Sequence, residues 1–236
     1  MRNLVPYFYA VFDKLLRFLW NTTANNNNYR GLVLMYHHIT DEKINTEPTC
    51  VCGISKFKDI INNKIIEGYH FISIDDIPSM ISDKSGEKFI VLTFDDIPET
   101  VFSNAYPFLK EKQIPFTIFI ATGLLNTDGY ISSEQLKVLS KDPLCTVGAH
   151  TVNHRNLRKT KNSLEEIVTS KVQLENIIGK KVDYFAYPYG RFYNVSLKNI
   201  KEAKKAGFKY AFGTINSPLT DISLKFQYFL PRQVLY

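Results

Sequence analysis

Cysteine is scarce in this sequence. The chain has 236 residues and only three cysteines, of which Cys50 and Cys52 form a C-x-C pair. A zinc ribbon or a redox motif would have C-x-x-C instead. A small, odd number of cysteines also argues against a disulfide scaffold. We therefore expect all three, Cys145 included, to be ordinary small residues.

The sequence also lacks a long uninterrupted apolar run. Near the N-terminus, the apolar stretch over residues 3–12 is followed by Asp13, Lys14 and Arg17. It is shorter than the roughly 20 residues that a membrane-spanning helix needs. No small-residue cleavage site follows it, so we do not expect a signal peptide. Apolar residues recur at helical spacing, which predicts an amphipathic helix over residues 1–20 that contacts a membrane surface or docks on its own domain.

Neither sign of charge dominates. Lysine and arginine number 29 against 23 aspartates and glutamates, which gives a net charge of +6. This modest excess suits an anionic surface such as a membrane or an acidic glycan. Basic residues do not form a stripe with interleaved aromatics, so nucleic acid is not an expected partner. With no signal peptide expected, a cytoplasmic or membrane-associated location is favoured over a secreted one, and the oligomeric state stays open.

Apolar runs alternate with amphipathic segments after a polar linker over residues 21–30. The runs predict seven strands, at LVLMY, HFISI, FIVLTF, FTIFIAT, TVGAH, DYFAYP and FKYAFGT. FIVLTF has no polar alternation, as is typical of parallel strands covered on both faces. Between the fifth and sixth strands, Ser163 and Glu166 predict a helix that starts with a capping box, and Gly179 ends it. This α/β pattern predicts one domain over residues 31–236, with a parallel sheet or a barrel.

Four of the predicted strands end in groups that can do chemistry. In a parallel α/β fold the C-terminal ends of the strands meet at one rim, which is where active sites lie. We therefore expect these groups to lie close together. They are His37 and His38, Asp95 and Asp96, His150 with His154 four residues on, and Pro188, Tyr189 and Gly190.

The two histidines of HTVNH have a spacing that can bind a metal. On a helical turn, His150 and His154 would face the same side, as the histidines of H-E-x-x-H helices do when they hold zinc. This spacing alone is weak evidence, because it often arises by chance. Two histidines with one carboxylate, however, make an open catalytic metal site. The carboxylates at the end of FIVLTF therefore favour a metal site.

Together, these motifs resemble those of the polysaccharide deacetylase family, also called the NodB-homology family or carbohydrate esterase family 4. TFDD at residues 93–96, HTVNH at 150–154 and YFAYPYG at 184–190 are similar to its first three motifs in order and spacing. The resemblance implies a distorted (β/α) barrel of about seven parallel strands. It also implies a metal-dependent hydrolase that removes N-acetyl groups from amino sugars such as N-acetylglucosamine. The expected partner is then a glycan substrate, such as a polysaccharide, peptidoglycan or a lipid-linked precursor.

The resemblance implies a role for each rim group. Asp96, His150 and His154 match the metal ligands, with Zn²⁺ expected and Co²⁺ or Ni²⁺ accepted by similar ligands. Asp95 matches the general base that acts on a metal-bound water as nucleophile. The backbone N–H of Tyr189 matches a donor to the oxyanion.

The acid that protonates the departing amine is expected on the first strand. All five histidines lie between His37 and His154, so the C-terminal histidine that many family members use is missing. LMYHHI resembles a subgroup, which includes poly-N-acetylglucosamine deacetylases, whose acid histidine lies on the first strand. His37 matches that histidine, and strand alternation predicts that His38 points away.

Two positions depart from the family pattern. Ile97 replaces a glycine, so the loop after the aspartates must turn without a permissive residue. Ala186 replaces an arginine that positions the catalytic aspartate, and Arg232 or Arg191 is expected to supply that charge instead.

Two other interpretations of the function stay open: an esterase that acts on O-acetyl groups, and a catalytically silent sugar-binding pseudoenzyme.

Overall fold

A computed structural model describes residues 29–83 and 85–236 of the chain. Seven of its strands run parallel in one sheet: β1 (Tyr29–Tyr36), β4 (His70–Phe71), β5 (Phe89–Asp95), β6 (Phe116–Ile120), β7 (Cys145–Ala149), β8 (Tyr184–Ala186) and β9 (Tyr210–Phe212). The short β10 (Leu219–Thr220) pairs antiparallel with β1. The strand order is β10-β1-β5-β6-β7-β8-β9, and β4 pairs with the start of β5. A separate small sheet pairs β2 (His38–Ile39) with β3 (Val51–Cys52).

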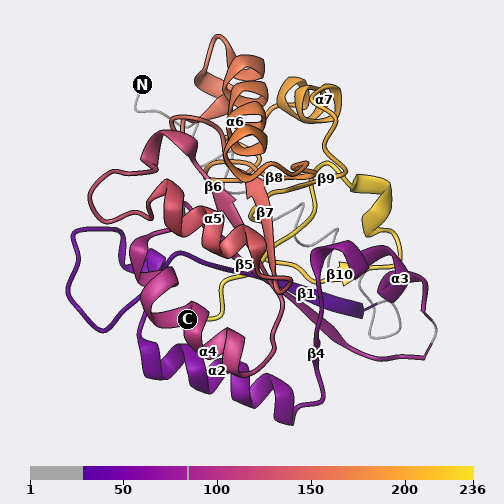
Figure 1. Cartoon of the computed structure of the whole chain (residues 1–236). Helices are drawn as coiled ribbons and strands as arrows, with labels where there is room; N and C mark the ends of the chain where they lie inside the picture. Colours follow the sequence, from indigo (N-terminus) through magenta and orange to yellow (C-terminus); the bar gives the residue numbers. More distant parts are fainter. Residues whose placement is uncertain (1–28, 84) are drawn as a thin grey trace, which may run out of the picture.

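Helices surround this sheet (Figure 1). The α-helices are α2 (Ile54–Ile66), α3 (Ile77–Ser82), α4 (Tyr106–Glu111), α5 (Ser133–Lys141), α6 (Ser163–Ile178) and α7 (Leu197–Lys205). Short 3₁₀ helices are η1 (Pro48–Cys50), η2 (Ile74–Asp76), η4 (Thr122–Leu124), η5 (Leu157–Lys159) and η6 (Ser223–Phe226), and η3 (Val101–Ala105) is a π-helical segment that leads into α4. Among the described residues, no helix has both the length and the apolar character to cross a membrane. The amphipathic helix predicted over residues 1–20 lies outside the described part of the chain.

The C-terminal segment closes the curled sheet. Leu230 exchanges two backbone hydrogen bonds with the end of β9, and Gln233 exchanges two with β1. Residues 230–233 thus bridge the two sides of the sheet and complete a distorted barrel. The predicted α/β fold with seven parallel strands is confirmed.

Strand alternation divides the core into two clusters. Along β5, the even-numbered residues from Ile90 to Phe94 belong to the larger cluster, which also contains the buried faces of α2, α4, α5, α6 and α7. Phe89 and Val91 belong to the smaller cluster inside the barrel. The same period of two carries Asp95 to the interior side. All residues of β5 are buried, as expected for a strand covered on both faces.

Two local predictions differ from the structure. The last two residues of the predicted linker over 21–30 belong to β1, because Tyr29 pairs with β10. The predicted capping box of α6 is wrong: Asn162 is the N-cap and makes no side-chain cap bond, and Glu166 bonds to another segment. Gly179 ends α6 in the left-handed conformation, with φ 66°, as predicted.

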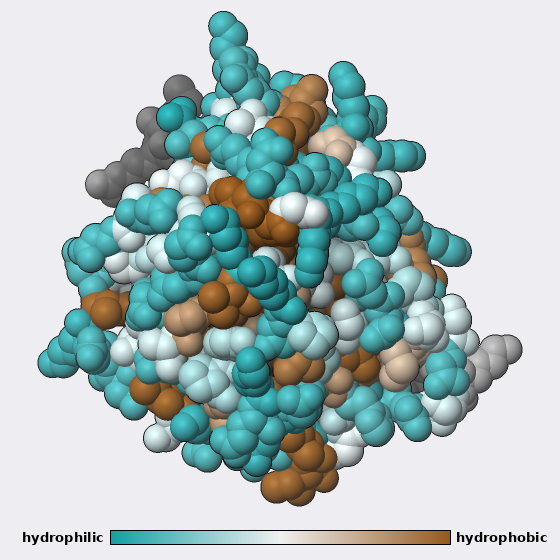
Figure 2. All heavy atoms as spheres, viewed as in Figure 1, coloured by the Kyte–Doolittle hydropathy of each residue, from teal (hydrophilic) through white to brown (hydrophobic). Residues whose placement is uncertain are grey.

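The face seen in Figure 2, which has the same view as Figure 1, is mainly hydrophilic. Hydrophobic side chains gather there only in small, separate patches among the described residues. Exposed apolar side chains on the helices, such as Val138 of α5 and Val172 of α6, are of this scattered kind. Apolar side chains scattered singly over a protein surface are normal and need no special explanation.

Candidate active site

The predicted rim groups converge at the C-terminal ends of β5 and β7. Asp96 Oδ1 lies 3.5 Å from His154 Nε2 and 3.7 Å from His150 Nε2. One ligand atom from each of these three residues lies within 4.8 Å of the others. Asp95 Oδ2 lies 3.9 Å from His150 Nε2. The structure therefore brings together four side chains that come from distant parts of the sequence.

Exposure differs sharply within this group. The side chains of His150 and Asp95 are only 1% and 3% exposed, whereas those of Asp96 and His154 are 19% and 24% exposed. The group therefore has a buried floor and an open side. A substrate would approach from the side of Asp96 and His154.

His150 is held in one orientation. Its Nδ1 lies 2.7 Å from the carbonyl oxygen of Ala186, which can only accept, so Nδ1 carries the proton and Nε2 keeps its lone pair. Burial lowers the pKa of His150 to about 4, although the charge of Asp95 opposes that shift. The imidazole is therefore neutral near pH 7, with its free nitrogen turned toward Asp96. This is the form of histidine that binds metals.

Asp96, His150 and His154 fit a divalent metal ion. Two imidazole nitrogens and one carboxylate, with an open side, are typical of catalytic metal sites. Asp96 Oδ1 is buried and has no hydrogen-bond partner within the described part of the chain. A buried carboxylate oxygen without a partner is costly unless an ion or water satisfies it. These three residues would hold the metal.

Asp95 is paired with a buried arginine. Arg232 donates from Nη1 and Nη2 to the two carboxylate oxygens, at 2.6 and 2.7 Å. Its Nε donates to the carbonyl oxygen of Gly213 at 3.0 Å, and its guanidinium lies 5.3 Å from the ring centroid of Phe119. Burial raises the pKa of Asp95, but the charges of Arg232 and His150 and the hydrogen bonds outweigh it and lower the pKa to about 2. Asp95 is therefore ionised and fixed in place.

This arginine reaches the site from the segment that closes the barrel. Ala186, at the position where the family pattern has an arginine, contributes only a methyl group to the interior cluster. Of the two arginines expected to replace that charge, Arg232 makes the contact with Asp95, whereas the side chain of Arg191 is exposed. The guanidinium that contacts Asp95 therefore comes from the C-terminal segment and not from the strand that contains Ala186.

The two histidines after β1 lie near the aspartates. The charge of His37 contributes to the lowered pKa of Asp95, so its imidazole is within electrostatic reach of that carboxylate. Its Nδ1 is buried and has no hydrogen-bond partner among the described residues. Burial and the charge of His37 lower the pKa of His38, and the charge of Asp96 opposes them. The expectation that the His38 side chain points away from the site stays a prediction.

Tyr189 lies at the open side of the site. Its ring centroid is 4.8 Å from that of His154, and the residue is 54% exposed. Its carbonyl oxygen accepts a hydrogen bond of 2.8 Å from the Thr214 hydroxyl, which fixes the peptide that follows it. An exposed ring beside His154 can contact a bound sugar.

The turn after Asp96 forms without glycine. Asp96 and Ile97 have φ angles of 61° and 56°, and the N–H of Ile97 donates to the carbonyl oxygen of Asp95 at 2.6 Å. The left-handed conformation costs an ordinary residue roughly 1–2 kcal/mol. Ile97 is only 1% exposed, and burying such a side chain contributes about 1.5–3 kcal/mol, which offsets the strain. The other left-handed non-glycine residues at this rim are Thr151, His154 and Tyr189.

Two supporting groups at the site were not predicted from the sequence. One is the carbonyl oxygen of Ala186, and a backbone acceptor leaves no signal in a sequence. The other is Glu166, whose carboxylate accepts hydrogen bonds from the loop between His150 and His154. Glu166 follows Ser163 by three residues, which is also the spacing of a capping box. The sequence therefore favoured a role in capping α6 and gave no sign of the contact with the loop.

The model of the polysaccharide deacetylase family matches residues 82–211. The chain belongs to this family. It is 32% identical over 164 residues to the poly-β-1,6-N-acetyl-D-glucosamine N-deacetylase of Staphylococcus aureus strain MRSA252, and the match covers 63% of this chain and 55% of that protein. The chain thus spans about half the length of the curated relatives that it matches.

Solved structures of polysaccharide deacetylases share this fold. A polysaccharide deacetylase from Bacillus cereus superposes with a TM-score of 0.77 at 24% identity, covering 88% of this chain and 65% of that one. IcaB from Ammonifex degensii superposes with a TM-score of 0.72 at 23% identity, covering 89% of this chain and 93% of that one. At this identity, these similarities establish the fold.

Proposed function

We propose that this chain hydrolyses the N-acetyl groups of amino-sugar residues in a polysaccharide or a glycan precursor. The observation that carries the proposal is the convergence of Asp95, Asp96, His150 and His154 at one rim of the barrel, with Asp95 ionised beside the other three. Membership of the polysaccharide deacetylase family supports the same activity. The β-1,6-linked specificity in the name of the staphylococcal relative makes poly-β-1,6-N-acetylglucosamine the first substrate to test.

In this proposal the carboxylates have separate tasks. A zinc ion held by Asp96, His150 and His154 would act as a Lewis acid and lower the pKa of water from 15.7 toward about 7. Asp95 accepts the proton of the water that attacks the amide carbonyl. Arg232 holds both oxygens of Asp95, so the base keeps its direction during the reaction. The exposed faces of Asp96 and His154 leave the substrate side open.

Two further groups complete the proposed reaction. The backbone N–H of Tyr189 donates to the oxyanion that forms on the carbonyl oxygen. His37 gives a proton to the departing amine, which is a poor leaving group without one. The position of Tyr189 beside His154, and the influence of His37 on the pKa of Asp95, support these assignments.

Acetate release tests the proposal. The protein is freed of metal with a chelator, divided, and reloaded with zinc in one portion, and both portions are given β-1,6 and β-1,4 N-acetylglucosamine oligomers. We expect the reloaded portion to release acetate and the chelated portion to be inactive. Faster release from one set of oligomers identifies the preferred linkage. Bound zinc without acetate release from either set would contradict the proposal and favour an O-acetyl substrate or a sugar-binding role.

Replacing His37 separates amide from ester hydrolysis. An amine leaving group needs a general acid, whereas an alkoxide leaving group needs less help, so we expect His37→Ala to lower amide hydrolysis by about 100- to 10,000-fold. Hydrolysis of an acetyl ester by the same variant should fall much less. The measurement is kcat/KM on an N-acetyl and an O-acetyl substrate for wild type, His37→Ala and His38→Ala. Equal losses on both substrates would exclude His37 as the acid.

A further inference from the structure

We propose that Glu166 is a positioning residue that holds the loop between the two histidine ligands in its metal-binding shape. The inference rests on the proposed metal site at Asp96, His150 and His154. It concerns the stretch from Thr151 to Asn153, called here the ligand loop. Glu166 lies in the first turn of α6, outside the motifs that suggested the site.

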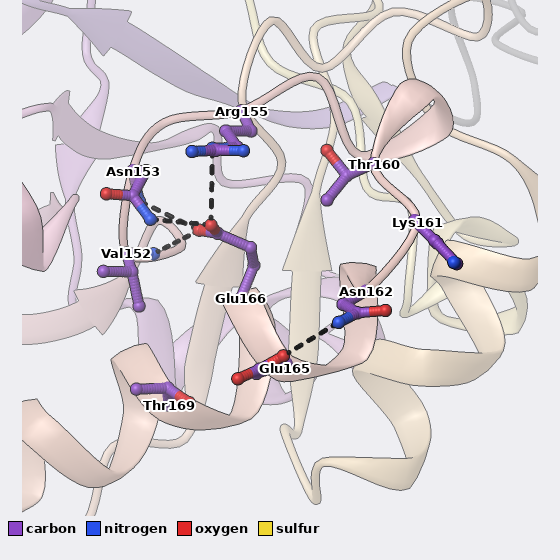
Figure 3. A pocket seen from close by; sticks show the side chains of 9 residues that line it. All are labelled: Val152, Asn153, Arg155, Thr160, Lys161, Asn162, Glu165, Glu166 and Thr169. Atoms are coloured by element: carbon purple, nitrogen blue, oxygen red, sulfur yellow. Dashed lines mark hydrogen bonds and ion pairs between the residues drawn. The ribbon is translucent and has the colours of Figure 1, made fainter.

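The Glu166 carboxylate takes three hydrogen bonds from the ligand loop (Figure 3). Its Oε2 accepts from the backbone N–H groups of Val152 and Asn153, at 3.1 and 2.9 Å. Its Oε1 accepts from Asn153 Nδ2 at 2.7 Å and lies 3.7 Å from Arg155 Nε. The side chain is only 12% exposed. Hydrogen bonds to a partly buried carboxylate are about twice as strong as neutral ones.

The opposite side of the ligand loop is held by backbone groups. The N–H groups of Thr122 and Gly123 donate to the carbonyl oxygens of Thr151 and Val152, at 3.1 and 2.7 Å. A Cβ atom at Gly123 would lie 2.8 Å from the Val152 oxygen, so this close approach requires glycine. The loop is therefore clamped from both sides by groups that do not touch the metal site.

The ligand loop needs such a clamp because the backbone is strained at its first residue and at the histidine that directly follows it. Thr151 and His154 have φ angles of 68° and 49°, in the left-handed region that costs an ordinary residue free energy. Without restraint the backbone would relax and carry the His154 imidazole away from His150. Helix α6 is fixed to the core through Ile167 and Leu174, which are fully buried. The hydrogen bonds of Glu166 attach the strained segment to this helix.

A role in capping α6 does not account for Glu166. Asn162 is the N-cap of α6 and makes no side-chain cap bond, and Glu166 is absent from the cap hydrogen bonds of the helix. The neighbouring Glu165 lies in the same first turn of the helix, is exposed, and accepts from Asn162 Nδ2 at 3.2 Å. Glu165 is therefore a matched control with the same charge, the same helix and no bond to the ligand loop among its described contacts.

The test is zinc affinity, measured by competition with a chromophoric chelator. Removing a partner that orients metal ligands typically weakens metal binding by about 10- to 100-fold. We expect Glu166→Ala to raise the zinc Kd by that factor. Glu166→Gln should raise the Kd by less, because it keeps one acceptor oxygen. Glu165→Gln should bind zinc with the wild-type Kd. In the metal-free protein, amide hydrogen exchange at Val152 and Asn153 should become faster in the Glu166 variants alone.

The outcomes separate this inference from the proposed function. If wild type binds zinc and Glu166→Ala binds it equally well, the positioning role is wrong. The role is also wrong if Glu165→Gln weakens zinc binding as much as Glu166→Ala does. If wild type binds no zinc, the proposed metal site is wrong, and the positioning role of Glu166 is wrong as well.

Asn153→Ala removes one hydrogen bond to Glu166 from an exposed position, so this variant replaces Glu166→Ala in the test if Glu166→Ala does not fold. It should raise the Kd by several-fold, and an unchanged Kd would overturn the inference.

Discussion

Replacing Arg232 with methionine is expected to lower the free energy of unfolding by about 3–5 kcal/mol. Methionine lacks the guanidinium but is long and flexible, so it leaves the buried Asp95 carboxylate without its partner. Removing one member of a buried ion pair costs this much because the other charge stays desolvated. Urea unfolding of the metal-free protein measures the effect. The same variant should lose about 100-fold in kcat/KM for acetate release, because the base is no longer held in position.

Two variants control for this prediction. Arg191→Met removes an exposed arginine, and because even an ion pair at the surface contributes only about 0–1 kcal/mol, the free energy of unfolding should change by no more than that. In the Asp95→Asn, Arg232→Met double variant neither charge remains, so part of the lost stability should return. Equal stability of the Arg232→Met and Arg191→Met variants would show that the buried pair does not stabilise the fold.

Replacing His154 with asparagine is expected to abolish metal binding and to lower acetate release by about 1,000-fold or more. A metal ion supplies several kcal/mol of transition-state stabilisation, and each 1.36 kcal/mol is a factor of ten in rate. Asparagine tolerates the left-handed backbone of this position, so the fold should be preserved. The measurement is bound zinc per chain, by elemental analysis, together with kcat on an N-acetylglucosamine oligomer.

A histidine outside the site provides the control for this variant. His70 lies on β4, and its side chain is 59% exposed. His70→Asn should therefore bind zinc and release acetate as wild type does. Wild-type zinc content in His154→Asn, or equal losses in the two variants, would contradict the assignment of His154 as a ligand.

The sequence predicted those parts of the fold that follow from local pattern. All seven predicted parallel strands form. In the central strands β5 and β6 every residue of the continuous apolar run is buried. The strand predicted at HFISI is shorter than expected, because only His70–Phe71 pairs in the sheet. Strand ends also predicted the site: a parallel sheet brings Asp95, Asp96 and His150 to one rim wherever they lie along the chain.

Features that depend on tertiary contacts could not be predicted. The sequence left Arg232 and Arg191 as alternatives, because the choice depends on which segment closes the barrel. The S-x-x-E pattern in the first turn of α6 fits a capping box and a loop contact equally well, and only the position of Val152 and Asn153 decides between them. At Ile97 the local preference against the left-handed conformation is overcome by burial.

The rate of acetate release by zinc-reloaded wild type and Asp95→Asn, on N-acetylglucosamine oligomers in ¹⁸O-labelled water, tests the central claim most directly. We predict that wild type releases acetate carrying one oxygen from the solvent. Asp95→Asn should bind zinc but release acetate about 100- to 10,000-fold more slowly, because the attacking water loses its base. Release by Asp95→Asn at the wild-type rate, or acetate without solvent oxygen, would contradict hydrolysis at this site.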